Sequence, residues 1–294
     1  MLECVVNISE GRRPDVVAAV AAACGPALLD VHTDPDHHRS VLTLAGPAEA
    51  VAGAALALAR TAIARIDLSV HAGVHPRLGA VDVVPFVPLP PDGTVAGGLD
   101  EAAEEARRWG ERAAAELGIP VFLYGDADPQ RRSLPDLRRT ACRGRPPDFG
   151  PAVPHRTAGA VAVGARPYLV AVNCELEGGA TGLAADLAAA RAVARAVRER
   201  DGGLPGVRAL GFILASKGRA QVSMNLVDLP ATGVETACEA VRREAERHGR
   251  SVTTVELVGL LPAAELARCS AKFLAWAGLS PDRTIEARLR STSG

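Results

Sequence analysis

Alternating apolar and polar positions in the first 125 residues predict a regular order of strands and helices. Runs rich in Val, Ile and Leu predict strands at 2–8, 27–33, 40–45, 81–86 and 120–125. Apolar positions spaced three and four residues apart predict helices at 13–24, 47–65 and about 99–117. The first six of these elements follow the order βαββαβ, which is the plan of split-βαβ or ferredoxin-like units.

The same order of elements returns from residue 168. Strands are predicted at 168–176, 207–214, 220–229 and 251–259, and helices at 181–200, 233–248 and about 263–277. We therefore expect an α/β (α+β) protein made of two βαββαβ ferredoxin-like subdomains, 1–167 and 168–294, with a substrate cleft between them. The segment 126–160 is rich in Pro, Gly and Arg, and we expect a long, weakly structured functional loop that could line this cleft.

Composition narrows the classes of function. With 48% hydrophobic and 23% charged residues, the 294-residue chain is typical of folded soluble proteins. A net charge of -1 gives no general attraction to nucleic acid or anionic membranes, and 3% aromatic residues are too few for base-stacking platforms. The N-terminus lacks the features of a signal peptide, and the scattered cysteines are typical of reduced thiols. We expect a cytoplasmic protein that binds neither nucleic acid nor membranes.

The stretch HAGVHPRLGAVDVVPF at 71–86 carries the most distinctive chemistry, with two histidines four residues apart. That spacing suits a zinc site on a helix, but Pro76 and the nearby glycines predict a loop. A metal site that takes a ligand from HTDPDHHRS at 32–40 remains an alternative. A loop imidazole at the entry of a strand suits proton transfer, so His75 is the preferred proton-transfer residue. His71 is expected to cap the loop or pack against the sheet.

Three further segments are candidates for binding. Arg39, between two predicted strands, suits a carboxylate partner, although 32–40 could equally be a solvated turn. The turn in VNISEGRRPD at 6–15 could bind an anion or could simply cap the next helix. Alternation along 220–228 places Gln221 and Asn225 on one polar face of their strand. No GxGxxG, P-loop or GxSxG motif is present.

Several stretches resemble the glutamate formimidoyltransferase (formiminotransferase) family, the transferase part of formimidoyltransferase-cyclodeaminase. They are ECVVNISEG (3–11), LLDVHTDPDHHRSVLTLAG (28–46), IDLSVHAGVHPRLGAVDVVPFVP (66–88), PVFLYGDA (120–127), PDFGPAVPHRTAGAVAVGARPYLVAVN (147–173), AQVSMNLVDL (220–229) and ELVGLLP (256–262). The string HPRxGAxDxxPF is the most specific of these motifs. The stretches follow the family's order and cover nearly the whole chain.

This resemblance implies transfer of the formimino group of N-formimino-L-glutamate to N5 of tetrahydrofolate, a late step of histidine degradation. It implies that His75 is the catalytic general acid/base, that tetrahydrofolate is a co-substrate and that no metal is needed. It also implies a homodimer in which two α/β subdomains enclose a basic tunnel. The implied folate-binding residues are Gly150, Pro151, Ala152, Val153, Pro154, His155, Arg156, Thr157, Ala158 and Gly159.

Residue type suggests further groups that could bind substrate, namely His32, His38, Arg39, Arg77, Gln221 and Asn225. The chain departs from the family at 155–160, where HRTAGA replaces a sequence close to VPSWGA, and at His38, where Asn is common. The alternatives are a related folate-dependent one-carbon transferase with another donor, a non-catalytic folate- or amino-acid-binding module, and a metal-dependent hydrolase. No cyclodeaminase region is expected in this chain, so a separate cyclodeaminase could act on the product.

Overall fold

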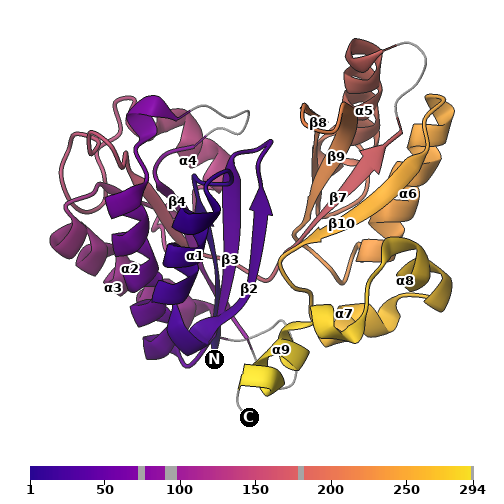
Figure 1. Ribbon diagram of the computed structural model, residues 1–294. Coiled ribbons are helices and arrows are strands. Elements are labelled where there is room, and N and C mark those ends of the chain that lie inside the picture. The colour runs from indigo at the N-terminus through magenta and orange to yellow at the C-terminus, as the bar shows by residue number, and fades with distance from the viewer. Residues whose placement is uncertain (72–76, 90–97, 178–181, 293–294) are drawn as a thin grey trace. The chain divides into compact units, whose positions relative to one another are not determined.

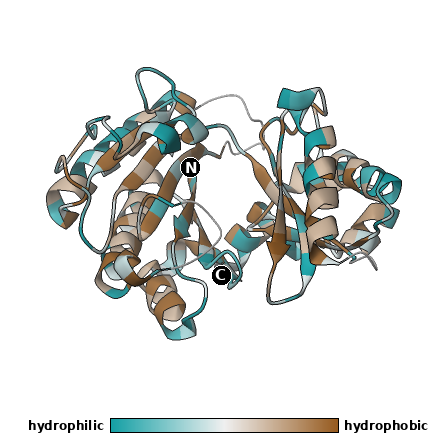
Figure 2. Cartoon of the chain, turned by 90° about the horizontal axis from the view of Figure 1, so that it is seen from above, coloured by the Kyte–Doolittle hydropathy of each residue, from teal (hydrophilic) through white to brown (hydrophobic). Residues whose placement is uncertain are grey.

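The computed structural model describes residues 1–71, 77–89, 98–177 and 182–292. The chain divides into two compact units, one built on Met1–Pro167 and the other on Tyr168–Ser291 (Figure 1). Figure 2 shows apolar residues gathered along the strands of each unit, as expected for sheets that form the cores. None of the helices in the described ranges is both long and apolar enough to cross a membrane.

In the described part of the first unit, six strands form one sheet in the order β2-β3-β1-β4-β6-β5. They are β1 (Leu2–Ile8), β2 (Leu28–Asp34), β3 (Arg39–Gly46), β4 (Val81–Pro88), β5 (Val121–Gly125) and β6 (Val161–Ala165). The pairs among β2, β3, β1 and β4 are antiparallel, which is the ferredoxin-like arrangement. Strands β6 and β5 then extend the sheet in parallel beyond β4.

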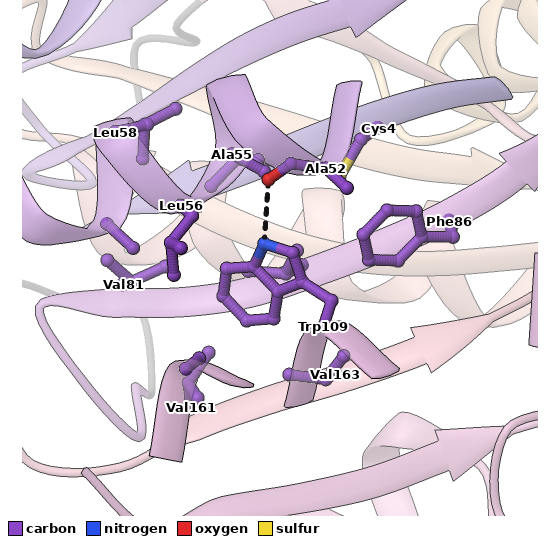
Figure 3. Packing of buried hydrophobic residues seen from close by; sticks show 14 of the residues in the cluster. Cys4, Ala52, Ala55, Leu56, Leu58, Val81, Phe86, Trp109, Val161 and Val163 are labelled. Atoms are coloured by element: carbon purple, nitrogen blue, oxygen red, sulfur yellow. Dashed lines mark hydrogen bonds between the residues drawn. The ribbon is translucent and has the colours of Figure 1, made fainter. Parts of the chain in front are cut away.

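Three helices pack on one face of this sheet, namely α1 (Pro14–Ala23), α2 (Ala48–Arg65) and α3 (Leu99–Leu117). The core beneath them centres on Trp109 of α3, whose Nε1 donates a 3.1 Å hydrogen bond to the Ala52 carbonyl of α2 (Figure 3). The short helix α4 (Leu134–Thr140) places Leu137 against Phe122 and Tyr124 of β5 in a second apolar cluster. Because neighbouring strand residues point to opposite faces, this second cluster lies on the other side of the sheet.

The second unit has an antiparallel sheet in the order β10-β7-β9-β8. Its strands are β7 (Val170–Leu176), β8 (Val207–Leu214), β9 (Arg219–Leu226) and β10 (Val252–Val258), and its two longer helices are α5 (Leu183–Val197) and α6 (Val234–Arg247). Its remaining helices in the described residues are α7 (Ala263–Arg268), α8 (Ala271–Ala277) and α9 (Ile285–Thr292). Short 3₁₀ turns lie at Gly25–Ala27 and Leu68–Val70 in the first unit and at Glu199–Asp201 and Pro281–Arg283 in the second. The expected fold class, two βαββαβ units, is confirmed.

Two local expectations were wrong. The single helix expected at 263–277 is two helices, because Cys269 leaves the helical conformation and Ser270 caps α8 by accepting the Phe273 N–H at 3.2 Å. The segment 126–160 is also not weakly structured, since it contains α4 and its backbone bonds to other parts of the unit. Strand β6, which follows this segment, was not expected because VAVGA is short and lies between Gly- and Pro-rich stretches.

Candidate functional site

The expected site residues that belong to the first unit lie around the segment that leads into β4. His75, the residue expected to be catalytic, is part of 72–76 and lies outside the described residues. The structure describes both neighbours of this segment, His71 before it and Arg77 after it. These two side chains meet groups from the end of β1 and from the β2–β3 hairpin, so the surroundings of the site can be built residue by residue.

Glu10 lies two residues after the end of β1, in the turn that was expected either to bind an anion or to cap the next helix. Its carboxylate is 1% exposed, and Oε1 accepts the backbone N–H groups of Gly11, Arg12 and Arg13 at 3.0, 2.8 and 3.0 Å. Burial alone would raise the pKa of Glu10, but hydrogen bonds from the Arg12 and Arg13 backbone and from the Arg13 guanidinium lower it to about 2. The turn therefore already holds an ionised carboxylate of its own.

The β2–β3 hairpin folds its tip back onto this turn. Asp34 accepts the backbone N–H groups of Asp36 and His37 at 2.8 and 2.9 Å and also pairs with the His37 ring. Burial alone would raise the pKa of Asp34, but these bonds, first of all the one with the His37 ring, lower it to about 2. His38 then takes a left-handed backbone conformation, with φ of 50°, and its Nε2 lies 3.1 Å from Oε1 of Glu10.

His71 stacks on His38, with ring centroids 3.8 Å apart and ring planes 19° from parallel. It also contacts Arg77, whose Nη1 lies 2.6 Å from Nε2 and 2.7 Å from Nδ1 of His71. Burial, followed by the charges of Arg77 and His38, lowers the pKa of His71 to about 4. His71 is therefore a neutral imidazole at pH 7 and can accept a hydrogen bond from Arg77.

Asp82 of β4 is a buried carboxylate that connects three segments. It is 2% exposed and accepts the Leu78 N–H at 2.6 Å and both terminal nitrogens of Arg138, from α4, at 3.1 and 2.5 Å. Burial lowers the pKa of Arg39, and the nearby charges of Asp82 and Asp34 oppose this shift. The positive charge of Arg39 is thus already balanced, at least in part, by carboxylates of the protein.

The end of the segment expected to bind folate lies directly beside the residues that follow Arg77. His155 and Gly159 exchange two backbone hydrogen bonds of 2.8 Å, and Nδ1 of His155 accepts the Ala158 N–H at 3.1 Å. This turn is joined to the start of β4, since Ala160 N donates to the Leu78 carbonyl at 3.0 Å and Ala80 N donates to the Ala158 carbonyl at 2.9 Å. The ring of His155 therefore acts as a cap within the turn.

The other residues expected to bind folate differ in exposure. Ala158 is buried, while Thr157 and Gly159 are half-buried, and the exposed members are Gly150, Pro151, Ala152, Val153, Pro154 and Arg156. Arg156 lies close enough to Asp67 for its charge to help lower the pKa of that carboxylate, after the hydrogen bonds from Ser69.

The remaining candidates lie on strands of the two different units. His32 lies on β2 opposite Val41, on the same face of the sheet as Arg39. Gln221 and Asn225 lie on β9 of the second unit, where Gln221 is buried beside Glu256 and Asn225 is exposed. The structure therefore brings His38, Arg39, Arg77 and the 155–159 turn together within one unit. Among the described residues, no group of three or more His, Cys, Asp or Glu side chains is arranged to hold a metal ion.

Sequence reasoning missed the roles of Glu10 and Asp82. Asp82 did carry a signal, because it is the one charged residue in the otherwise apolar strand VDVVPF. A charge in a buried strand needs a partner, and Arg138 provides it from 56 positions away. The partner of Glu10 across the site, His38, is 28 positions away, so no local pattern could identify the pair.

Comparison with known proteins gives consistent matches along the chain. The family model described as formiminotransferase domain, N-terminal subdomain, matches residues 1–166, and the model described as formiminotransferase domain matches residues 171–281. A glutamate formimidoyltransferase from Thermoplasma acidophilum is 36% identical, and the match covers 100% of this chain and 98% of that protein. Another from Streptococcus pyogenes serotype M1 is 37% identical and covers 90% of each. A formimidoyltransferase-cyclodeaminase from Sus scrofa is 40% identical over 89% of this chain but only 50% of that longer protein.

Proposed function

The chain belongs to the formiminotransferase family, and from this premise we propose that it is a glutamate formimidoyltransferase. The proposed reaction transfers the formimino group of N-formimino-L-glutamate to N5 of tetrahydrofolate. The two relatives that carry this name match 90% or more of this chain, which supports the transferase activity across both units.

One observation carries the proposal beyond the family name. The turn at 155–159, expected to bind folate, is hydrogen-bonded to residues 78–80, which directly follow His75-Pro76-Arg77 in the chain. A folate-binding segment and a proton-transfer residue must lie close together for this reaction, because N5 of the pterin is the nucleophile. The hydrogen bonds between the 155–159 turn and the start of β4 support such a site.

In the proposed mechanism, N5 attacks the formimino carbon and forms a tetrahedral adduct, which then loses the amine of glutamate. His75 removes the N5 proton and protonates the leaving nitrogen, a role worth about 10²–10⁴ in rate. Arg77 is our candidate for the carboxylate of the donor, since its guanidinium borders the segment that contains His75. Arg39, whose charge is partly balanced by Asp34 and Asp82, would mainly hold the hairpin in place.

We extend the proposal to the setting of the reaction. Tetrahydrofolate serves as co-substrate without a metal, and the enzyme works as a cytoplasmic homodimer in histidine degradation. A separate cyclodeaminase would close the ring of the product. The names of the relatives from Sus scrofa and Rattus norvegicus support this last step, because they combine the two activities in one chain.

A related one-carbon transferase with another donor is the second candidate. It is favoured by the 155–159 turn, where His155 caps the backbone and Arg156 adds an exposed charge. Both residues differ from those that the family resemblance leads us to expect.

A coloured-product assay tests the proposal. The purified protein is incubated with tetrahydrofolate and N-formimino-L-glutamate and quenched in acid, so that the 5-formimino product cyclises to the coloured methenyl form. The wild type and His75→Asn are compared with His248→Asn, a matched change at an exposed histidine after α6. We expect colour from the wild type and His248→Asn but not from His75→Asn. A folded wild type that gives no colour refutes this donor–acceptor pair.

A further inference from the structure

The ring of His155 holds the 155–159 turn closed from inside. Its Nδ1 accepts the backbone N–H groups of Thr157 at 3.3 Å and of Ala158 at 3.1 Å. These N–H groups lie two and three residues further along the chain, where the side-chain oxygen of an Asn or Asp commonly accepts in turns and helix caps. Val, which begins the VPSWGA-like sequence of the family at this position, has no atom that could accept them.

The two hydrogen bonds exist in only one protonation state of the ring. A ring nitrogen accepts through its lone pair, so Nδ1 of His155 carries no proton and the proton of the neutral ring lies on Nε2. In an imidazolium both ring nitrogens are donors. Protonation of His155 would therefore point an N–H group at the N–H groups of Thr157 and Ala158, and the turn would lose both bonds. An imidazole changes its charge in the range of about pH 5 to 8.

The peptide group between Thr157 and Ala158 is fixed at both of its ends. Its carbonyl oxygen accepts the Leu68 N–H at 2.8 Å, and its N–H is the group that donates to His155. The next carbonyl, that of Ala158, accepts the Ala80 N–H at 2.9 Å. Loss of the His155 bonds would thus loosen the peptide groups through which the turn is attached to the rest of the first unit.

The His155 ring has no acidic partner that would stabilise its protonated form in place. Within the described ranges, its hydrogen bonds are those with Thr157 and Ala158, and it forms no ion pair. The titratable and charged residues of the turn and of the segments bonded to it, together with the ion-pair partner of Asp82, are Asp67, His71, Arg77, Asp82, Arg138 and Arg156. The side chain is half-buried between the exposed residues Pro154 and Arg156, so water can supply the proton.

We propose that His155 is a positioning residue that makes folate binding depend on pH, because it closes the 155–159 turn while its ring is neutral and releases the turn when the ring is protonated. The inference rests on the proposed function, in which this turn binds tetrahydrofolate. Binding of tetrahydrofolate to the closed turn then competes with binding of one proton to His155. A linkage of one proton changes a dissociation constant by at most about tenfold per pH unit.

Tetrahydrofolate titrations at about pH 7.5 and about pH 5.5, on the two sides of the imidazole range, test this inference. The dissociation constant is measured without oxygen for the wild type, His155→Asn and His155→Val. Asn places Oδ1 on the same Cγ that carries Nδ1 in His and accepts hydrogen bonds at either pH, whereas Val accepts none. His248→Asn, at an exposed histidine after α6, is the matched control. The thermal unfolding midpoint of each protein is measured at both pH values.

We expect the dissociation constant of the wild type to be about 10-fold higher at the lower pH, and that of His248→Asn to change by the same factor. His155→Asn should lose most of this pH dependence. His155→Val should bind tetrahydrofolate at the higher pH about as weakly as the wild type does at the lower one, because both lack the acceptor. His71 does not contribute, since burial lowers its pKa to about 4 and its ring stays neutral in both titrations.

The inference is overturned if the wild type binds tetrahydrofolate equally well at both pH values, or if His155→Asn keeps the full pH dependence. Variants that lower the unfolding midpoint but leave the ratio of the two dissociation constants as in the wild type also overturn it, since that result indicates a purely structural cap. A folded wild type that binds no tetrahydrofolate at either pH refutes the proposed function itself. The titration at the higher pH tells this failure apart from the others.

Discussion

Asp82→Asn should destabilise the first unit and disturb its site without changing the shape of the side chain. The carboxylate is 2% exposed and accepts hydrogen bonds from Leu78 N and from Nη1 and Nη2 of Arg138. The amide can still accept the Leu78 N–H, but it removes the charge that the Arg138 guanidinium faces. Because the guanidinium is only 16% exposed, it cannot regain full hydration in place.

Removing one member of a buried ion pair costs about 3–5 kcal/mol, chiefly because the other charge is left without compensation. The Oδ1 of Asn can keep the two hydrogen bonds that Oδ1 of Asp82 accepts, from Leu78 N and from Nη1 of Arg138. We therefore expect the lower end, about 3 kcal/mol, which is about 10²-fold in the folding equilibrium. The same change should lower kcat, because the Leu78 N–H that Asp82 holds is adjacent to Arg77.

The chain contains two tryptophans, of which Trp109 lies in the first unit, so unfolding of this unit can be followed separately. In a Trp276→Phe background, the fluorescence of Trp109 during urea unfolding reports the unit that contains Asp82. Asp82→Asn, Arg138→Gln and the double variant complete a mutant cycle. Asp136→Asn, which removes an exposed carboxylate from α4, is the control and should change little.

We expect the double variant to be less destabilised than the sum of the single variants by about 1–3 kcal/mol, as for residues in direct contact. If Asp82→Asn unfolds within about 0.5 kcal/mol of the parent, the carboxylate is not a buried structural charge and the reasoning fails. If the cycle is additive, Arg138 is not the group that Asp82 stabilises.

Two further predictions follow from the same region. The pKa of His71 is lowered from 6.5 to about 4, so the unfolded chain binds a proton at this residue at higher pH than the folded one does. The contribution of His71 to stability is therefore complete above pH 6.5 and is lost as the pH falls from 6.5 towards 4. His71→Asn should reduce this pH dependence of the free energy of unfolding, measured by urea unfolding of the first unit. Plots of that free energy against pH that run parallel for the wild type and the variant contradict this prediction. Gly159→Ala should weaken folate binding and lower the thermal unfolding midpoint, because φ is 69° and a Cβ would lie 2.3 Å from the Leu78 carbonyl oxygen. Tetrahydrofolate titration and thermal melts check this, and an unchanged variant would mean that the 155–159 turn is not held against β4.

The periodic elements were the easiest part of the fold to predict. The bounds of β1, β8 and α3 agree with the expected ranges 2–8, 207–214 and 99–117, because each has one face that must be buried along its whole length. Helices α7 and α8 were harder, since the capping of α8 by Ser270 interrupts a pattern that otherwise reads as one helix. Segment 126–160 was harder still, because its order comes from hydrogen bonds to distant parts of the chain and not from periodicity.

For the site, too, the residues of a contiguous motif could be predicted from the sequence, but their partners from distant parts of the chain could not. The string HPRLGAVDVVPF and the family resemblance identify the region of His75 and Arg77, since motifs are contiguous in sequence. The groups that surround this region are not contiguous. Glu10 meets His38 across 28 positions, and Asp82 meets Arg138 across 56.

Local chemistry along the chain thus specifies which elements form and which residue types are available to a site, because hydrophobic periodicity and capping act over a few residues. The strand order β2-β3-β1-β4-β6-β5 specifies which of those residues meet, because it places the end of β1 beside the β2–β3 hairpin and the start of β4 beside the 155–159 turn. Charges that would be solvated in isolation become buried and paired through these contacts. The low pKa values of Glu10 and Asp34 and the neutral state of His71 are therefore properties of the folded unit.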